Sequence, residues 1–164
     1  MTWYYLSVTL HVLAALLWLG GMMFLAAVGA PVLRQVDSAV LRAELFRKLG
    51  VQFRAVGWAA IVVLLVTGVS NLWLRGWLRS DVILTRGFWL APFGRMLLFK
   101  LVAVFLMLII QATHDFRQGP RASQTVPGSP AALRFRRRAA LLARVNALIG
   151  VALIYFAVRL ARGG

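Results

Sequence analysis

The chain has 164 residues, of which 62% are hydrophobic, and its mean hydropathy is +0.82. This apolar share is well above the roughly 45–50% of an ordinary soluble domain, so a soluble globular fold is excluded. The chain has no cysteine, which excludes disulfides and thiolate metal sites. Its net charge of +15 comes from cations that lie mostly between apolar runs, so the composition favours contact with anionic lipid headgroups over nucleic-acid binding.

The first predicted element is an uncharged stretch from Met1 to Leu33. Because it begins with aromatic residues and lacks a basic segment, we interpret it as a retained helix rather than a cleaved signal peptide. A second uncharged run covers residues 55–74, and each run is long enough to cross roughly 30 Å of hydrocarbon. Apolar runs of this kind predict membrane spans near residues 4–30, 53–75, 90–113 and 139–160. The expected fold is all-α: a single integral membrane four-helix bundle that comprises residues 1–164.

The connections between these spans predict the orientation. Residues 34–54 carry hydrophobic side chains at near-helical spacing and are expected to form an amphipathic segment at the membrane interface. Residues 75–92 are expected to form a loop on the opposite surface. The first and third connections, with the residues that border them, carry twelve Lys and Arg residues, and the other surface carries six. Because the more basic surface faces the cytoplasm, we predict a multi-pass protein of the bacterial cytoplasmic (inner) membrane with both termini outside the cytoplasm.

Polar residues inside the apolar runs are the candidate site residues, because a charge at the centre of a span costs about 2.5–3.5 kcal/mol on insertion scales. Helical spacing places Lys100 on one face of the third helix and His11 on one face of the first. The face of the third helix comprises Met96, Lys100, Ala103, Met107, Gln111 and His114, and that of the first comprises Tyr4, Ser7, His11, Trp18 and Met22. The second helix adds Thr67 and Asn71, and the fourth adds Tyr155 and Arg159. We therefore expect hydrogen-bonding groups to converge in the outer half of the bundle.

The remaining polar groups have simpler interpretations. His114, at the other end of the third helix, is explained by helix capping and headgroup contact. The four carboxylates, Asp37, Glu44, Asp81 and Asp115, are predicted to lie outside the apolar runs. Glycosidase, nuclease and catalytic-triad chemistry therefore have no support.

Several short motifs resemble those of the CopD-like group of bacterial membrane proteins, to which the HemJ-type protoporphyrinogen oxidases are distantly similar. They are His11, the segment Trp18-Leu19-Gly20-Gly21, Pro31, Thr67-Gly68, and Gly94-Arg95 leading to Lys100. The resemblance implies either copper handling across the membrane or binding of haem b, with His11 as the ligand of the metal or haem iron and Lys100 beside it. The chain lacks the aromatic and histidine residues that follow the first-helix glycines in HemJ-type proteins, so oxidase activity is not inferred.

The donor set favours haem b over copper. Copper(I) prefers thiolate, thioether or imidazole ligands, and this chain offers only His11, Met22, Met96 and Met107 as reasonable ones. Haem needs one or two axial ligands, an apolar slot, and cations for its propionates. We expect His11 as axial ligand, with Lys100, Arg95, Asn71, Tyr155 and Arg159 as further cofactor-binding residues. Whether the protein is an enzyme is left open.

A third hypothesis is a non-catalytic subunit or assembly partner of a larger membrane complex, or a homo-oligomer. It rests on small residues that would allow close helix packing. They are Gly20, Gly21, Ala26, Ala27, Ala147, Gly150 and Ala152.

Overall fold

The computed structural model describes residues 2–118, 120–121, 124–126 and 129–164, and this part of the chain is helical with no strand. The first long helix runs through α1 (Thr2–Ala15), η1 (Leu16–Gly20), α2 (Gly21–Phe24), η2 (Leu25–Gly29) and α3 (Ala30–Arg34). It is followed by α4 (Ala39–Leu74), the short α5 (Ser80–Ile83) and α6 (Arg86–Leu90), α7 (Pro92–Thr113) with η3 (His114–Gln118), and α9 (Pro130–Ala161). Four of these helical stretches are long and apolar enough to cross a membrane, which confirms the all-α membrane bundle.

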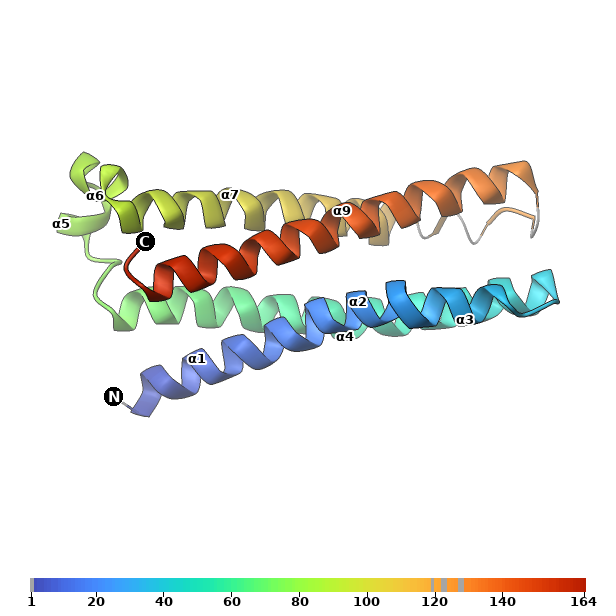
Figure 1. Ribbon diagram of the computed structural model, residues 1–164, viewed down its shortest axis with the longest axis horizontal. Helices are drawn as coiled ribbons and strands as arrows, with labels where there is room; N and C mark the ends of the chain where they lie inside the picture. Colours follow the sequence, from blue (N-terminus) through green and yellow to red (C-terminus); the bar gives the residue numbers. More distant parts are fainter. Residues whose placement is uncertain (1, 119, 122–123, 127–128) are drawn as a thin grey trace.

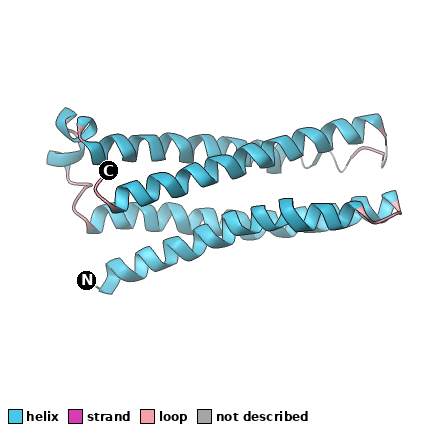
Figure 2. Ribbon diagram, in the orientation of Figure 1, coloured by secondary structure: helices cyan, strands magenta, loops and turns pink. Residues whose placement is uncertain are grey.

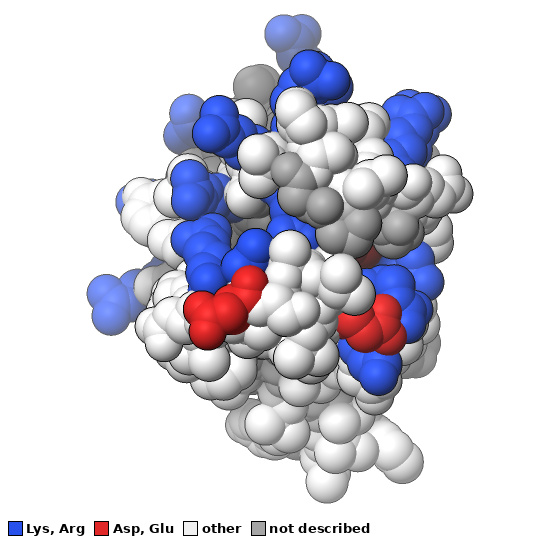
Figure 3. Space-filling view, turned by 90° about the vertical axis from the view of Figure 1, so that its right-hand side faces the viewer, with Lys and Arg blue, Asp and Glu red and all other residues white. Residues whose placement is uncertain are grey.

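The four long helices lie roughly parallel and form two pairs, with α1 against α4 and α7 against α9 (Figure 1). Both termini lie at the same end as α5 and α6, which we call the terminal end. The opposite end carries the turn into α4 and the beginning of α9. Lys and Arg side chains are spread over this arginine-rich end, with few acidic ones among them (Figure 3). The two termini therefore lie at the same end of the bundle, as expected. The helices extend beyond the expected apolar runs mainly at the arginine-rich end.

Capping residues and prolines determine where the helices begin. Ser38 and Ser129 accept hydrogen bonds from backbone N–H groups in the first turns of α4 and α9, at 3.2 Å each. Thr85 accepts from the Phe88 N–H of α6 at 3.3 Å. Pro92 and Pro130 are the first residues of α7 and α9, where the missing proline N–H costs no hydrogen bond. The amphipathic segment expected at residues 34–54 is therefore not an element of its own, since most of it forms the beginning of α4.

The first long helix contains two wider π-helical turns, η1 and η2. Pro31 explains the second, because proline has no N–H to donate to the preceding turn and its ring crowds the carbonyl four residues before it. The first turn buries both Trp18 and Leu19, at 3% and 6% exposed. Two adjacent bulky residues thus reach the bundle interior, where they pack with Ile61 and Met107 in the central core.

The terminal end is closed by an aromatic cluster in place of the expected loop. The rings of Trp77 and Phe93 stack with centroids 4.5 Å apart, and Phe88 packs against both. Gly76 makes the turn out of α4 with a φ of 75°, which residues with a side chain rarely adopt. The predicted loop at residues 75–92 is therefore mostly structured: Figure 2 shows α5 and α6 as helix with short loop segments between them. It packs on the beginning of α7.

Candidate functional site

His11 lies on the face of α1 that packs against α4. Its Nδ1 atom is 2.8 Å from the Thr67 hydroxyl, and the Ser7 hydroxyl, one turn earlier, donates to the Thr67 backbone carbonyl at 3.4 Å. Gly68 lies beside the ring: a Cβ atom built there would be 3.5 Å from His11 Cε1. The motifs His11 and Thr67-Gly68, which are far apart in the sequence, therefore form one contact.

The hydrogen bonds of Thr67 determine which ring nitrogen of His11 carries the proton. The Thr67 hydroxyl has a single hydrogen, and its shortest acceptor is the Val63 carbonyl at 2.6 Å. This is the usual bond from a helical threonine to the preceding turn. Its oxygen is then left to accept from His11 Nδ1–H. In the neutral ring the lone pair is therefore on Nε2.

Lys100 and Asn71 accompany His11 in this half of the bundle. Lys100 is half-buried on α7 and has no hydrogen bond or ion pair within the described residues. The Asn71 side-chain oxygen is buried and likewise lacks a hydrogen-bond partner in the described part of the chain. We call the bonded pair Thr67 and His11, with Asn71 one turn further along α4 and Lys100 on α7, the polar site; it lies in the half of the bundle nearest the terminal end.

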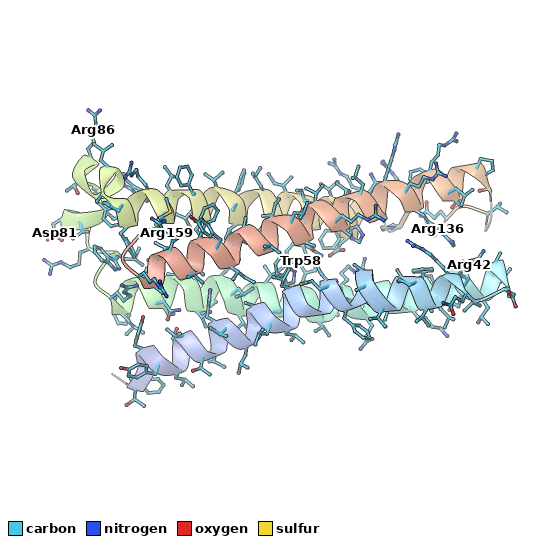
Figure 4. All side chains as sticks on the ribbon, in the orientation of Figure 1. Arg42, Trp58, Asp81, Arg86, Arg136 and Arg159 are labelled. Atoms are coloured by element: carbon cyan, nitrogen blue, oxygen red, sulfur yellow. The ribbon has the colours of Figure 1, made fainter. Side chains whose placement is uncertain are left out.

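The other predicted cofactor-binding residues lie on the outside of the bundle. Tyr155 is 57% exposed, and Arg95 and Arg159 are exposed near the terminal end, where Figure 4 labels Arg159. No hydrogen bond or ion pair joins these three residues to His11 in the part of the chain that is described. They face the surroundings of the bundle rather than the polar site.

The predicted methionine ligands are distributed over two separate clusters. Met107 is 3% exposed and lies in the central core, with Met22 at the edge of that core. Met96 packs instead on the aromatic cluster at the terminal end. Met22 also follows His11 by eleven residues, roughly 16 Å along the helix at the standard rise, so these two cannot hold one ion together.

A second group of polar side chains, which the sequence did not predict, surrounds Asp115 near the arginine-rich end. The Asp115 carboxylate accepts hydrogen bonds from Trp58 Nε1 at 2.9 Å and from Gln111 Nε2 at 2.7 Å. Its other oxygen lies 2.8 Å from His114 Nδ1, and the Arg54 guanidinium donates to the Asp115 backbone carbonyl at 3.2 Å. Asp115 is only 8% exposed. The prediction that every carboxylate lies outside the apolar helices was therefore wrong for Asp115.

This group extends across the bundle to α9. Asn146, 2% exposed, donates to the Gln111 side-chain oxygen at 2.7 Å. We call Arg54, Trp58, Gln111, His114, Asp115 and Asn146 the Asp115 cluster. It joins α4, α7 with η3, and α9. Two sequence signals could have found it: Asn146 is an amide inside the fourth apolar run, and Asp115 follows Gln111 by four residues.

The comparison with protein families supports a specific assignment. Residues 47–160 match the family model for copper resistance protein D, CopD. The chain belongs to the CopD family. As a CopD protein with four apolar helices, it is a multi-pass protein of the inner membrane. The matched range includes Lys100 and the whole Asp115 cluster, whereas His11 precedes it.

One curated relative extends the similarity over nearly the whole chain. An uncharacterised protein of Aquifex aeolicus (strain VF5) is 30% identical over 156 residues, which cover 94% of this chain and 92% of the relative. No solved structure matches the chain.

Proposed function

We propose that this CopD-family protein binds haem b in the half of its bundle nearest the termini, with His11 as the axial ligand. The observation that carries the proposal is the hydrogen bond of 2.8 Å between His11 Nδ1 and Thr67. It leaves the lone pair on Nε2 and fixes the orientation of the ring. A metal-bound histidine usually donates a hydrogen bond from its other ring nitrogen to a neighbouring protein group.

The neighbouring residues fit a porphyrin better than a bare ion. Haem brings four nitrogen ligands of its own, so one protein imidazole is enough to hold its iron. Lys100 offers an unpaired ammonium to a propionate, and the Asn71 side-chain oxygen can accept a hydrogen bond from the second propionate if that group is protonated. Bound there, the haem would supply one-electron redox chemistry. The protein residues would hold the iron, orient the imidazole and provide charge.

Copper handling is the second candidate, and the family description favours it, since the model that matches residues 47–160 is named for copper resistance. His11 Nε2 is a suitable ligand for copper(I), and thioethers would have to complete the site. Because Met96 lies on the aromatic cluster, apart from Met22 and Met107 in the central core, the three methionines support transient contacts along a path better than one closed site.

The absorption spectrum of the purified protein distinguishes these candidates. After expression in haem-sufficient cells, we expect a Soret band that is lost in His11→Ala and retained in His114→Ala, which removes the only other histidine. Thr67→Val should weaken haem binding by about 10–100-fold, the typical effect of removing the hydrogen-bond partner that orients a ligand histidine. A colourless protein that contains copper, with the copper lost in His11→Ala, would reject haem in favour of copper handling.

We further propose that both termini are outside the cytoplasm, so that the His11 site lies in the outer half of the membrane. The basis is the excess of Lys and Arg at the arginine-rich end. Because the chain has no cysteine, Gln124→Cys and a cysteine added after Gly164 can be labelled one at a time. An impermeant maleimide applied to spheroplasts should label only the C-terminal cysteine, and permeabilised membranes should label both. Labelling of Gln124→Cys alone in spheroplasts would invert the orientation.

A further inference from the structure

Two buried polar atoms in the middle of the bundle have complementary character. Trp18 Nε1 can only donate a hydrogen bond and Asn146 Oδ1 can only accept one, and neither has a partner among the described residues. Trp18 is 3% exposed and Asn146 is 2% exposed. A buried donor or acceptor without a partner costs about 1–3 kcal/mol, so an occupant that satisfies both is strongly favoured.

Contacts bring together the helices that carry these two atoms. Leu19, which follows Trp18, packs against Gly150, one turn after Asn146 on α9. On α4, a Cβ atom at Gly57 would lie 3.8 Å from Trp18 Cδ1, the ring atom bonded to Nε1. The N–H edge of Trp18 therefore faces a glycine adjacent to Trp58, a member of the Asp115 cluster.

The Asp115 cluster extends from this region toward the surface. Asn146 bonds to Gln111, Gln111 bonds to Asp115, and Asp115 contacts His114. The His114 side chain is 34% exposed, whereas that of Asp115 is 7% exposed. His114 therefore links a buried carboxylate to the exterior.

We propose that the Asp115 cluster is a proton-loading site, which exchanges protons with the aqueous phase at the arginine-rich end, and that a water molecule held by Trp18 and Asn146 extends its hydrogen-bond network inward. A proton from water binds His114 and forms an imidazolium whose Nδ1–H points at Asp115. Transfer along the 2.8 Å contact leaves a neutral imidazole and a protonated carboxyl group. The Gln111 amide positions the Asp115 carboxyl group, and the Asn146 amide positions Gln111 and the water. The ligands of this site are a proton and water, independent of any metal at His11.

The surroundings of Asp115 favour a site that carries charge reversibly. From α4, Arg54 is the facing cation, and it also lies 5.9 Å from the centre of the Phe116 ring. From α9, the cluster member is the uncharged Asn146, and on η3 itself the facing titratable group is His114. The ionised state of Asp115 is stabilised too, because Trp58, Gln111 and His114 donate to its carboxylate.

Infrared difference spectra of the full chain in lipid nanodiscs test the proton site. Lowering the pH should produce the band of a carboxylic acid in an apolar environment. We expect this band to vanish in Asp115→Asn. It should persist in Asp81→Asn, because the carboxylate that this control removes is exposed. In His114→Gln, exchange of the carboxyl proton with D2O should slow by about 10²-fold, a typical contribution of a positioned proton-transfer group. A band that survives in Asp115→Asn, or exchange that is unchanged in His114→Gln, would overturn the proposal.

The proposed water has its own measurement, which begins with the unmodified protein. In the unmodified protein, replacing H2¹⁶O with H2¹⁸O should shift the O–H stretch of one internal water. This shift should disappear in Trp18→Phe, which keeps the ring but lacks the donor, and remain in Trp89→Phe, whose indole bonds instead to the Ile83 carbonyl. No isotope-sensitive band, or one that persists in Trp18→Phe, would refute the water site. Both measurements are made without haem, so they are independent of the test at His11.

Discussion

Replacing Asp115 with alanine is expected to lower the free energy of unfolding by about 1–3 kcal/mol, the typical cost of leaving a buried hydrogen-bonding group without its partner. The substitution leaves Trp58 Nε1, Gln111 Nε2 and His114 Nδ1 without their acceptor. Water cannot readily replace the carboxylate, because Asp115 lies inside three packed helices. Reversible unfolding in mixed micelles, followed by tryptophan fluorescence, measures the change.

Asp81→Ala is the matched control for this measurement. Asp81 forms an ion pair with Arg79 at 2.9 Å, with side chains 61% and 71% exposed. An exposed pair contributes no more than about 1 kcal/mol. Equal losses in the two variants would show that the Asp115 cluster does not stabilise the bundle.

The second large effect is expected at Gly94, in the first turn of α7. A Cβ atom there would overlap the carbonyl group of Phe88 and lie 3.0 Å from Trp89 Cα. These are backbone atoms of α6, so a side-chain rotation cannot relieve the clash. Gly94→Ala should therefore displace α6, disturb the Trp77–Phe93 stack, and destabilise the protein by about 1–3 kcal/mol, the usual cost of overpacking. Unfolding measurements and hydrogen exchange in residues 80–93 would detect this.

Gly87→Ala provides the comparison, because nothing lies within 4 Å of a Cβ atom at that position. Since alanine is the better helix former by about 1 kcal/mol, this variant should be as stable as the parent or slightly more so. If the two alanine variants behave alike, the close approach between α6 and α7 is not what holds the terminal end together.

The face of the third helix shows how far helical periodicity leads. Met107 and Gln111 are buried, and Met96, Lys100 and His114 are half-buried, so the predicted inward direction is confirmed. Tyr155 shows the limit of predictions from helical spacing. Spacing tells which residues share a face of one helix, but not which face packs against the other helices. The α9 face that packs against the bundle carries Asn146 and Gly150, and Tyr155 lies elsewhere on the helix.

The sequence by itself determined a membrane protein of four spans with both termini at the same end, because the length and apolarity of each run depend only on local composition. It also indicated His11 and Lys100 as the polar groups inside the apolar runs. Only the tertiary structure decided that His11 is oriented by Thr67, that the methionines are separated, and that Asp115 is buried. These outcomes depend on how the helices are rotated against one another, and on a wide π-helical turn at residues 114–118. That turn ends α7 inside the bundle with Asp115 facing Trp58 and Gln111, where hydrogen bonds from two helices offset the cost of burying a carboxylate.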